Sequence, residues 1–139
     1  MPGSILLDSS FLYALYDADD QYHARAVSFA SGQTTLSVVP DVVLPEVAYL
    51  LARSGGVPAI LTFLDVLLEA QVQLHPVLQE DIRRAREIMA HYADNRLNFV
   101  DCCLMALAER LDIGQVCTFD RRDFSIFRPA HCDYLELLP

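Results

Sequence analysis

The segment that decides the fold reads NFVDCCLMALAERL from Asn98 to Leu111, followed shortly by GQVCTFDRRDF from Gly114 to Phe124. It predicts an apolar helix, a tight turn at Gly114, a buried strand and a charged loop. Asp101 lies in the first turn of that helix, and Asp120 marks the end of the strand. A carboxylate among apolar residues costs free energy unless it has a partner. The segment therefore raises the question of what these two acids face.

Strands and helices alternate along the rest of the chain. The predicted strands are 4–7, 35–39, 72–76, 116–119 and 132–137; the predicted helices are 10–16, 19–32, 40–54, 57–70, 78–92 and 98–111. This alternation indicates a three-layer α/β/α fold with a mainly parallel sheet of about five strands. If strand one is central, the strand order is 3-2-1-4-5. The length of 139 residues predicts a single domain covering residues 1–139.

Composition excludes several classes of protein. The net charge is −9 and every basic residue is arginine. A phosphate-binding P-loop, a receiver domain and a haloacid-type phosphatase all use a lysine. Because the chain has no lysine, these three classes are excluded. The negative charge argues against non-specific nucleic-acid binding unless the acids gather in a metal site. The cysteines form no CxxC pair and the histidines are scattered, which argues against a zinc site.

The apolar content predicts a partner rather than a membrane. Hydrophobic residues make up 53% of the chain, above the ~45–50% typical of soluble domains. Acids such as Asp41, Glu46 and Asp65 interrupt the most apolar stretches, so we expect no membrane span. The first residues lack the basic region of a signal peptide. We expect a cytoplasmic protein whose surplus apolar surface, especially residues 57–68, covers a homodimer or partner interface.

Four acids are candidates for a chemical role, and each also has a structural alternative. Asp8 ends strand one and could simply cap the next helix. Glu46 falls on the apolar stripe of its helix, where the alternative is a buried salt bridge with Arg53 or another arginine. Asp101 could complete a capping box with Asn98.

The fourth acid, Asp120, could be a turn residue that caps the segment 121–124. Asp94 and Asp123 are nearby acids for which we favour such structural roles. The four acids nevertheless share one location. Asp8 and Asp120 end strands one and four, Glu46 and Asp101 lie on adjacent helices, and all are expected at one edge of a doubly wound sheet. Independent capping roles would not need to converge. Inward acids without lysine or histidine indicate hard cations such as Mg²⁺ or Mn²⁺.

The ordered set of these motifs resembles the PIN domain, most closely the VapC-type ribonuclease toxins of toxin–antitoxin pairs. The segments that carry the resemblance are Asp8-Ser9-Ser10, the helix with Glu46, Asn98-Phe99-Val100-Asp101 and the run from Thr118 to Phe124. The resemblance spans essentially the whole chain. It implies an acidic quartet at Asp8, Glu46, Asp101 and Asp120.

The resemblance also implies a function and further site residues. We expect an endoribonuclease in which the quartet holds one or two Mg²⁺ or Mn²⁺ ions, with a cognate antitoxin as partner. Ser10 and Thr118 match polar positions that orient water or ligands, and Asp123 matches a frequent extra acid. Arg121 and Arg122 would hold substrate phosphates, or face solvent. The competing hypotheses are a catalytically silent PIN-like binding module and a DNA-directed or flap-type nuclease.

Overall fold

Five parallel strands form one sheet in the computed structural model, which describes residues 1–139. The strands are β1 (Ile5–Leu7), β2 (Ser37–Pro40), β3 (Val72–His75), β4 (Gln115–Cys117) and β5 (Glu136–Leu138). Their order is β3-β2-β1-β4-β5, with every pair parallel. The predicted fold class and strand order are both confirmed.

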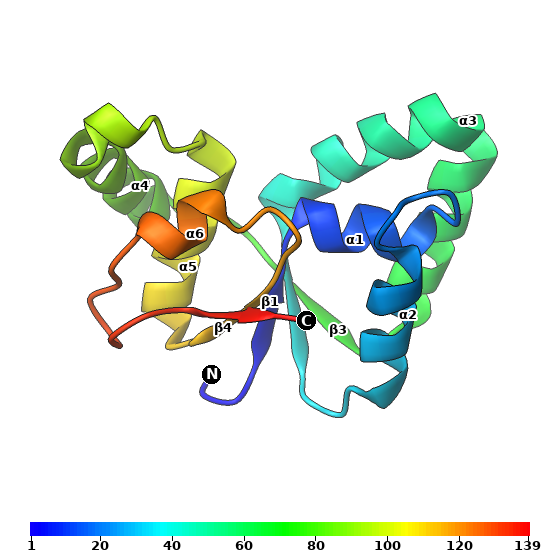
Figure 1. Cartoon of the computed structure of the whole chain (residues 1–139), viewed down its shortest axis with the longest axis horizontal. Helices are drawn as coiled ribbons and strands as arrows, with labels where there is room; N and C mark the ends of the chain where they lie inside the picture. The colour runs from blue at the N-terminus through cyan, green and yellow to red at the C-terminus, as the bar shows by residue number, and fades with distance from the viewer.

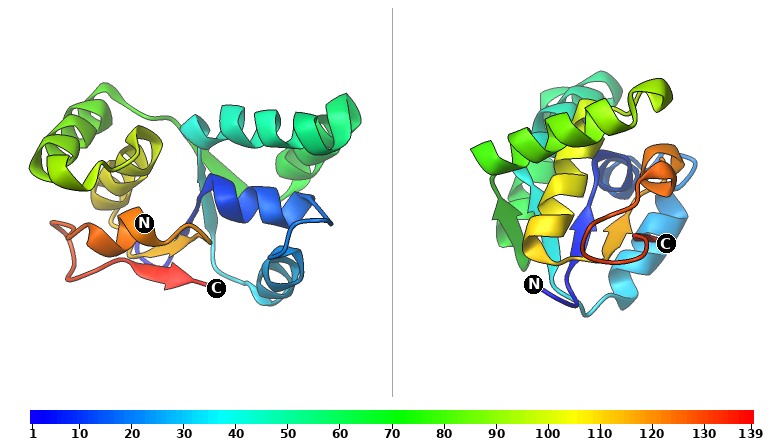
Figure 2. Two further views of the ribbon diagram at one scale, coloured as in Figure 1. Left: turned by 45° about the horizontal axis from the view of Figure 1, so that its top comes forward. Right: turned by 90° about the vertical axis from the view of Figure 1, so that its left-hand side faces the viewer.

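Helices cover both faces of this sheet (Figures 1 and 2). One layer holds α1 (Ser9–Tyr16), α2 (His23–Gly32) and α3 (Leu44–Glu69); the other holds α4 (Gln79–His91), α5 (Phe99–Leu111) and α6 (Arg122–Ile126). Short 3-10 turns, Asp41–Val43 and Ala93–Asn95, precede α3 and α5. All connections are helical crossovers, so every strand ends at the same edge of the sheet. The carboxyl edge of the sheet therefore collects the residues that follow β1, β2 and β4.

The helix α5 is the most buried helix of the molecule. Every side chain from Cys102 to Ala108 is buried, on all sides of the helix. A helix that is apolar all round belongs inside a protein, and α5 packs against α4 and α6 in the layer over the sheet. Its first turn, with Asp101, is thereby fixed relative to the strands.

A glycine pair, Gly55-Gly56, divides the third helix into two helical stretches at a bend. Residues 44–69 form one helix that is interrupted only at Gly56, whose φ of 70° and ψ of −165° are not helical. Such a positive φ favours glycine. The predicted break between the helices 40–54 and 57–70 is therefore confirmed, although the first of them begins at Leu44, after a 3-10 turn, and not at residue 40. We call residues 57–69, which follow the bend, the outer half of α3.

The outer half of α3 exposes many apolar side chains. Val57, Leu61 and Leu68 are 64%, 54% and 74% exposed. By length and composition, residues Asp41–Glu69 would suffice to cross a membrane, although only 17% of their most apolar window is buried in the structure. Contrary to the expectation from the sequence, the acids in this segment do not by themselves exclude a membrane span on grounds of length and composition. Phe63 and Leu67 of this segment are buried in the core, whereas Val57, Leu61 and Leu68 lack a cover within the chain.

Several element boundaries differ from the predictions, and α2 and β5 begin later than expected. The helix α2 begins at His23, not at residue 19 or 20, because the side chains of Asp17 and Asp20 accept hydrogen bonds from the N–H groups of Asp19 and Tyr22. Such aspartate turns compete with a helix. The last strand begins at Glu136, not at residue 132.

Candidate active site

The carboxyl group of Asp8 is the buried centre of the candidate site. Asp8 follows β1 directly and is 3% exposed. Its Oδ1 accepts hydrogen bonds from the N–H of Phe11 at 3.0 Å and from the hydroxyl of Ser10 at 2.8 Å. The side chain thus caps α1, which is the structural role that the sequence allowed for Asp8. Burial raises the pKa of Asp8 to about 6, despite these hydrogen bonds.

Thr118 connects Asp8 with Asp120. The register pairs Leu7 with Cys117, so the next residues of β1 and β4 lie side by side. The buried hydroxyl of Thr118 donates to Oδ2 of Asp8 and accepts from the N–H of Asp120 at 3.0 Å. The sequence analysis placed Ser10 and Thr118 near the acids, and the structure brings both into hydrogen-bond contact with Asp8.

Asp101 reaches the same edge from the first turn of α5. Asn98 caps this helix by accepting from the N–H groups of Val100 and Asp101 at 2.8 and 3.3 Å. The N–H of Asn98 itself donates to Oδ2 of Asp123 at 2.8 Å. Asp123, and not Asp101, therefore performs the reciprocal part of the cap, and the capping-box alternative for Asp101 is wrong. The carboxyl of Asp101 remains available for another role.

The pKa of Asp101 is raised to about 8. Burial is the largest cause, followed by a hydrogen bond to Asp123 and by the negative charges of Asp123, Asp8 and Asp120. The carboxyl groups are thus close enough to repel one another. Such repulsion is relieved by a proton or by an external cation.

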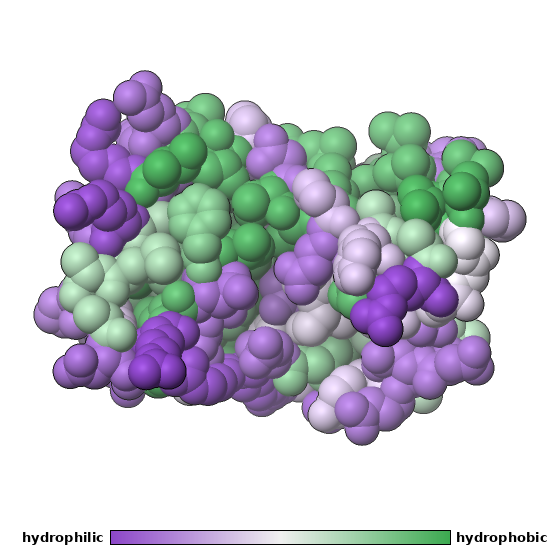
Figure 3. All heavy atoms as spheres, turned by 90° about the horizontal axis from the view of Figure 1, so that it is seen from above, coloured by the Kyte–Doolittle hydropathy of each residue, from purple (hydrophilic) through white to green (hydrophobic).

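All four acids of the predicted quartet line one hollow of about 280 Å³, which we call the acid hollow. Figure 3 looks onto this edge of the molecule, where hydrophilic side chains surround a central recess. The complete lining is Asp8, Ser9, Ser10, Tyr13, Asp20, Tyr22, Glu46, Leu50, Asp101, Phe119 and Asp120. It contains no arginine and no histidine. The protein itself places no cation among these carboxylates.

Glu46 and Asp120 do not have the structural roles that were considered for them, namely a buried salt bridge for Glu46 and a helix cap for Asp120. Glu46 is exposed and forms no salt bridge, so its predicted burial on the apolar stripe is wrong. The stripe is formed by its neighbours Val43, Val47 and Leu51. Arg53 instead lies over the ring of Tyr49. Asp120 is also exposed, and α6 begins without a side-chain cap.

The two arginines after Asp120 have partners outside the lining of the acid hollow. Arg121 donates to the main-chain oxygen of Pro139. Arg122 forms a salt bridge with Asp123 at 2.7 Å and donates to the main-chain oxygen of Asn95. Neither lines the hollow. Arg122 thus supports the segment that precedes α5. Asp123, the possible extra acid, does not line the hollow either.

The hollow contains three polar residues that the sequence analysis missed: Asp20, Tyr13 and Tyr22. They come from α1 and from the turn before α2, which follow Asp8 in the chain. The run Asp17-Ala18-Asp19-Asp20 was a visible cluster of acids, but its turn geometry depends on which acid accepts which N–H group. Only the packing of α2 beside the hollow selects Asp20.

The carboxylates fit a divalent cation by their chemistry. Carboxylate oxygens are the ligands that Mg²⁺ and Mn²⁺ prefer, and the mutual repulsion at Asp101 provides a reason to bind one. No three histidine, cysteine, aspartate or glutamate side chains are already arranged as a metal site. Binding would therefore require side chains such as the exposed Glu46 and Asp120 to rotate inward.

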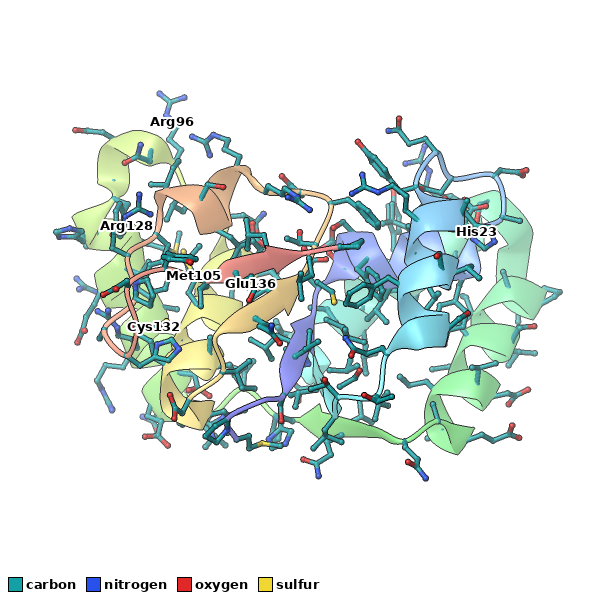
Figure 4. The ribbon with its side chains drawn as sticks, turned by 60° about the horizontal axis from the view of Figure 1, so that its bottom comes forward. His23, Arg96, Met105, Arg128, Cys132 and Glu136 are labelled. Atoms are coloured by element: carbon teal, nitrogen blue, oxygen red, sulfur yellow. The ribbon has the colours of Figure 1, made fainter.

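The cysteines and histidines play no part in the site. Burial raises the pKa of both Cys102 and Cys117 to about 12, so these thiols stay protonated and unreactive. His23 and Cys132 lie on opposite flanks of the molecule (Figure 4).

A larger hollow of about 510 Å³ lies between α1, α2 and the strand edge. Of its 19 lining residues, 14 are hydrophobic and none is an acid. Its size does not make it the active site, because it offers no group that could activate water or hold a cation. We call it the apolar hollow.

Comparison with known proteins identifies the family of this arrangement. The PIN domain profile matches residues 5–128. This chain belongs to the PIN domain family. It is 32% identical over 135 residues to Ribonuclease VapC26 of Mycobacterium tuberculosis, covering 97% of this chain and all of the relative. The predicted family is therefore confirmed.

Solved structures agree with this PIN domain assignment. VapC20 of Mycobacterium tuberculosis, described as a sarcin–ricin loop cleaving toxin, superimposes with a TM-score of 0.81 at 25% identity, over 92% of this chain and 98% of that one. VapBC2 of Rickettsia felis, bound to a DNA fragment from its promoter, matches with a TM-score of 0.68 at 14% identity, over 96% of each chain. A toxin–antitoxin complex from Klebsiella pneumoniae gives 0.68 at 15% identity, over 87% of this chain and 90% of that one. The last two support the fold alone.

Proposed function

We propose that this PIN domain is a VapC-type endoribonuclease that hydrolyses RNA phosphodiester bonds with Mg²⁺ or Mn²⁺. The observation that carries the proposal is the acid hollow itself: Asp8, Glu46, Asp101 and Asp120 share it without any arginine or histidine. The similarity to a relative named as a ribonuclease supports the same activity.

In the proposed enzyme the four carboxylates hold one or two divalent ions. When bound, such ions activate water and neutralise the charge that develops on the phosphodiester. Asp8 is kept in one orientation by Ser10 and Thr118. Burial and then the neighbouring acids raise the pKa of Asp101, and a cation bound among these carboxylates would favour its ionised form.

We propose two protein partners, a second copy of the chain and a cognate antitoxin. The outer half of α3 supplies an exposed apolar surface that a homodimer would cover. Two of the similar solved structures are toxin–antitoxin assemblies. We place the protein in the cytoplasm, where its RNA substrates would be.

The decisive experiment incubates a panel of RNAs with the protein and Mg²⁺ or Mn²⁺, and compares wild type with Asp8→Asn. We expect metal-dependent cleavage that chelator abolishes and that Asp8→Asn reduces at least about a hundredfold, since even indirect metal-site partners contribute 10- to 100-fold. Cleavage that survives the substitution would exclude this site. Single-stranded DNA in the same panel tests the alternative of a DNA-directed nuclease.

A second measurement separates the enzyme from a silent binding module. If no RNA is cut although Mn²⁺ raises the thermal midpoint of the wild-type protein, the fold binds metal without catalysis. Sedimentation of the wild type and of Leu61→Glu, which places a charge on the outer half of α3, tests the homodimer. We expect the substitution to shift the protein to the monomer.

A further inference from the structure

One wall of the acid hollow is aromatic. The rings of Tyr22 and Phe119 are stacked face to face, with their centroids 4.5 Å apart and their planes inclined by 4°. Both residues line the hollow together with Asp8 and Asp120. Phe119 directly precedes Asp120 in the chain. The aromatic pair is therefore the immediate neighbour of the candidate catalytic acids.

This aromatic pair is held rigidly. The N–H of Phe119 donates to the hydroxyl of Ser10 at 2.9 Å, and its ring stacks against buried Phe11 at 6.0 Å. The N–H of Tyr22 donates to Oδ1 of Asp20 at 2.8 Å. A surface ring that is fixed in advance loses little conformational entropy when a ligand stacks on it.

Two arginines lie beside the pair. The guanidinium carbon of Arg25 is 5.6 Å from the centroid of the Phe119 ring. Arg25 and Arg121 both donate to the main-chain oxygen of Pro139, which brings the two guanidinium groups together. Neither forms a salt bridge with a carboxylate side chain. Two guanidinium groups without an acidic side-chain partner therefore lie next to the aromatic pair.

We propose that Tyr22, backed by Phe119, forms with Arg25 and Arg121 a nucleotide subsite that stacks an unpaired base on the Tyr22 ring next to the cleaved phosphodiester. The inference rests on the proposed ribonuclease function. A base within a duplex is already stacked on its neighbours, whereas a single strand or a loop can present a free face to an aromatic ring. The arginines hold the adjacent phosphate. The subsite thus selects single-stranded or looped RNA.

Tyr22 acts in this proposal as a positioning residue, because it binds the substrate next to the reacting atoms. Leucine at this position would preserve apolar packing but remove the ring, while phenylalanine would preserve the ring. The pair Tyr22→Phe and Tyr22→Leu therefore separates base stacking from simple packing. Tyr134, which is 67% exposed and outside the hollow, supplies the control Tyr134→Leu.

The test measures fluorescence anisotropy of a labelled single-stranded RNA 12-mer and of its blunt duplex, in the presence of Mg²⁺. All variants carry Glu46→Gln to keep the strand intact; the exposed Glu46 side chain makes no hydrogen bond that folding would lose. We expect Tyr22→Leu to weaken single-strand binding roughly ten- to hundredfold, with Tyr22→Phe and Tyr134→Leu unchanged. Duplex binding should not respond to any of them.

Salt dependence tests the arginines in the same assay. Removing one phosphate contact lowers the slope of log affinity against log salt by about 0.7 for a single strand. We expect this change for Arg25→Gln and none for Arg83→Gln, a control on α4.

Three results would overturn the subsite: no preference of the Glu46→Gln protein for the single strand, unchanged single-strand binding by Tyr22→Leu, or equal weakening of duplex binding. The proposed nuclease activity fails on a different observation, namely cleavage that is absent or is not affected by Asp8→Asn. Strand-selective binding that depends on Tyr22, without any cleavage, would leave the subsite standing and remove the nuclease.

Discussion

Two regions of this PIN domain hold poorly exposed carboxylates, and they solve the resulting electrostatic problem differently. Between α4 and α5, Asp81 lies 2.8 Å from Nε of Arg110, and Glu109 lies 2.6 Å from Nε of Arg84. In the acid hollow, no arginine or histidine is present. The first region is complete within the chain. The second requires a proton or a cation from outside.

The pKa values express the same difference. Burial favours a higher pKa for Glu109, but hydrogen bonds from Arg84 and from the N–H of Ala130 bring its pKa below the ordinary value. Burial and neighbouring acids raise the pKa of Asp101, with no arginine to oppose them. A carboxylate that is paired by its own chain is part of the scaffold, whereas one that is left without a pair is a candidate for chemistry.

Breaking a scaffold pair should have the largest effect on stability. Arg110→Leu leaves Asp81, which is 2% exposed, with an uncompensated buried charge. We expect a loss of about 3–4 kcal/mol in the free energy of unfolding, measured by urea denaturation at pH 7. Cleavage per folded molecule should stay unchanged. A fall in cleavage with intact stability would show that the two regions do not have separate roles.

The pH dependence of the metal-free protein should identify the unpaired region. The pKa of Asp8 is raised from 3.8 to about 6, so the folded state binds its proton more tightly than the unfolded state does. The stabilisation is therefore complete below about pH 4 and is lost as the pH rises through 6, a decrease of about 3 kcal/mol at most. Subtracting the curve of Asp8→Asn isolates this contribution. A difference that grows with pH would have the wrong sign.

The sequence predicted the framework because the framework depends on local patterns. Alternating strands and helices determined the sheet order, and Asp8 and Asp120 were placed correctly because each directly follows a buried strand. Glu46 was assigned correctly to the hollow but wrongly to the buried stripe. Adjacent positions on a helix differ by about 100°, so a pattern of apolar residues leaves the direction of a single side chain open.

Features that depend on tertiary contacts could not be predicted. Arg121 and Arg122 follow Asp120 in sequence, but their partners are main-chain oxygens of Pro139 and Asn95. Such partners carry no signature in the sequence, since any residue offers a main-chain oxygen.

Removing one of the unpaired charges should stabilise the metal-free protein. Asp101→Asn eliminates the repulsion from Asp8 and Asp120, and its amide can donate to Asp123. We expect a gain of about 1–2 kcal/mol at pH 9, smaller than full burial would give because the carboxyl is partly exposed. The rise in thermal midpoint caused by Mn²⁺ should disappear. Asp133→Asn, on the exposed segment before β5, should retain it; an unchanged Mn²⁺ response in Asp101→Asn would rule out the metal site.

The smallest expected effect comes from the hydroxyl that connects the two strand-end acids. Thr118→Val keeps the shape of a side chain that is 0% exposed, but removes the donor to Asp8 and the acceptor for the N–H of Asp120. We expect a loss of about 1 kcal/mol in the free energy of unfolding. The Thr118 hydrogen bond lowers the pKa of Asp8, so the pH at which the Asp8 contribution is lost should move upward. Thr34→Val, at an exposed position, should leave that pH unchanged. A downward movement would mean that Thr118 stabilises the protonated carboxyl, and the acid hollow would then be adapted to a proton instead of a cation.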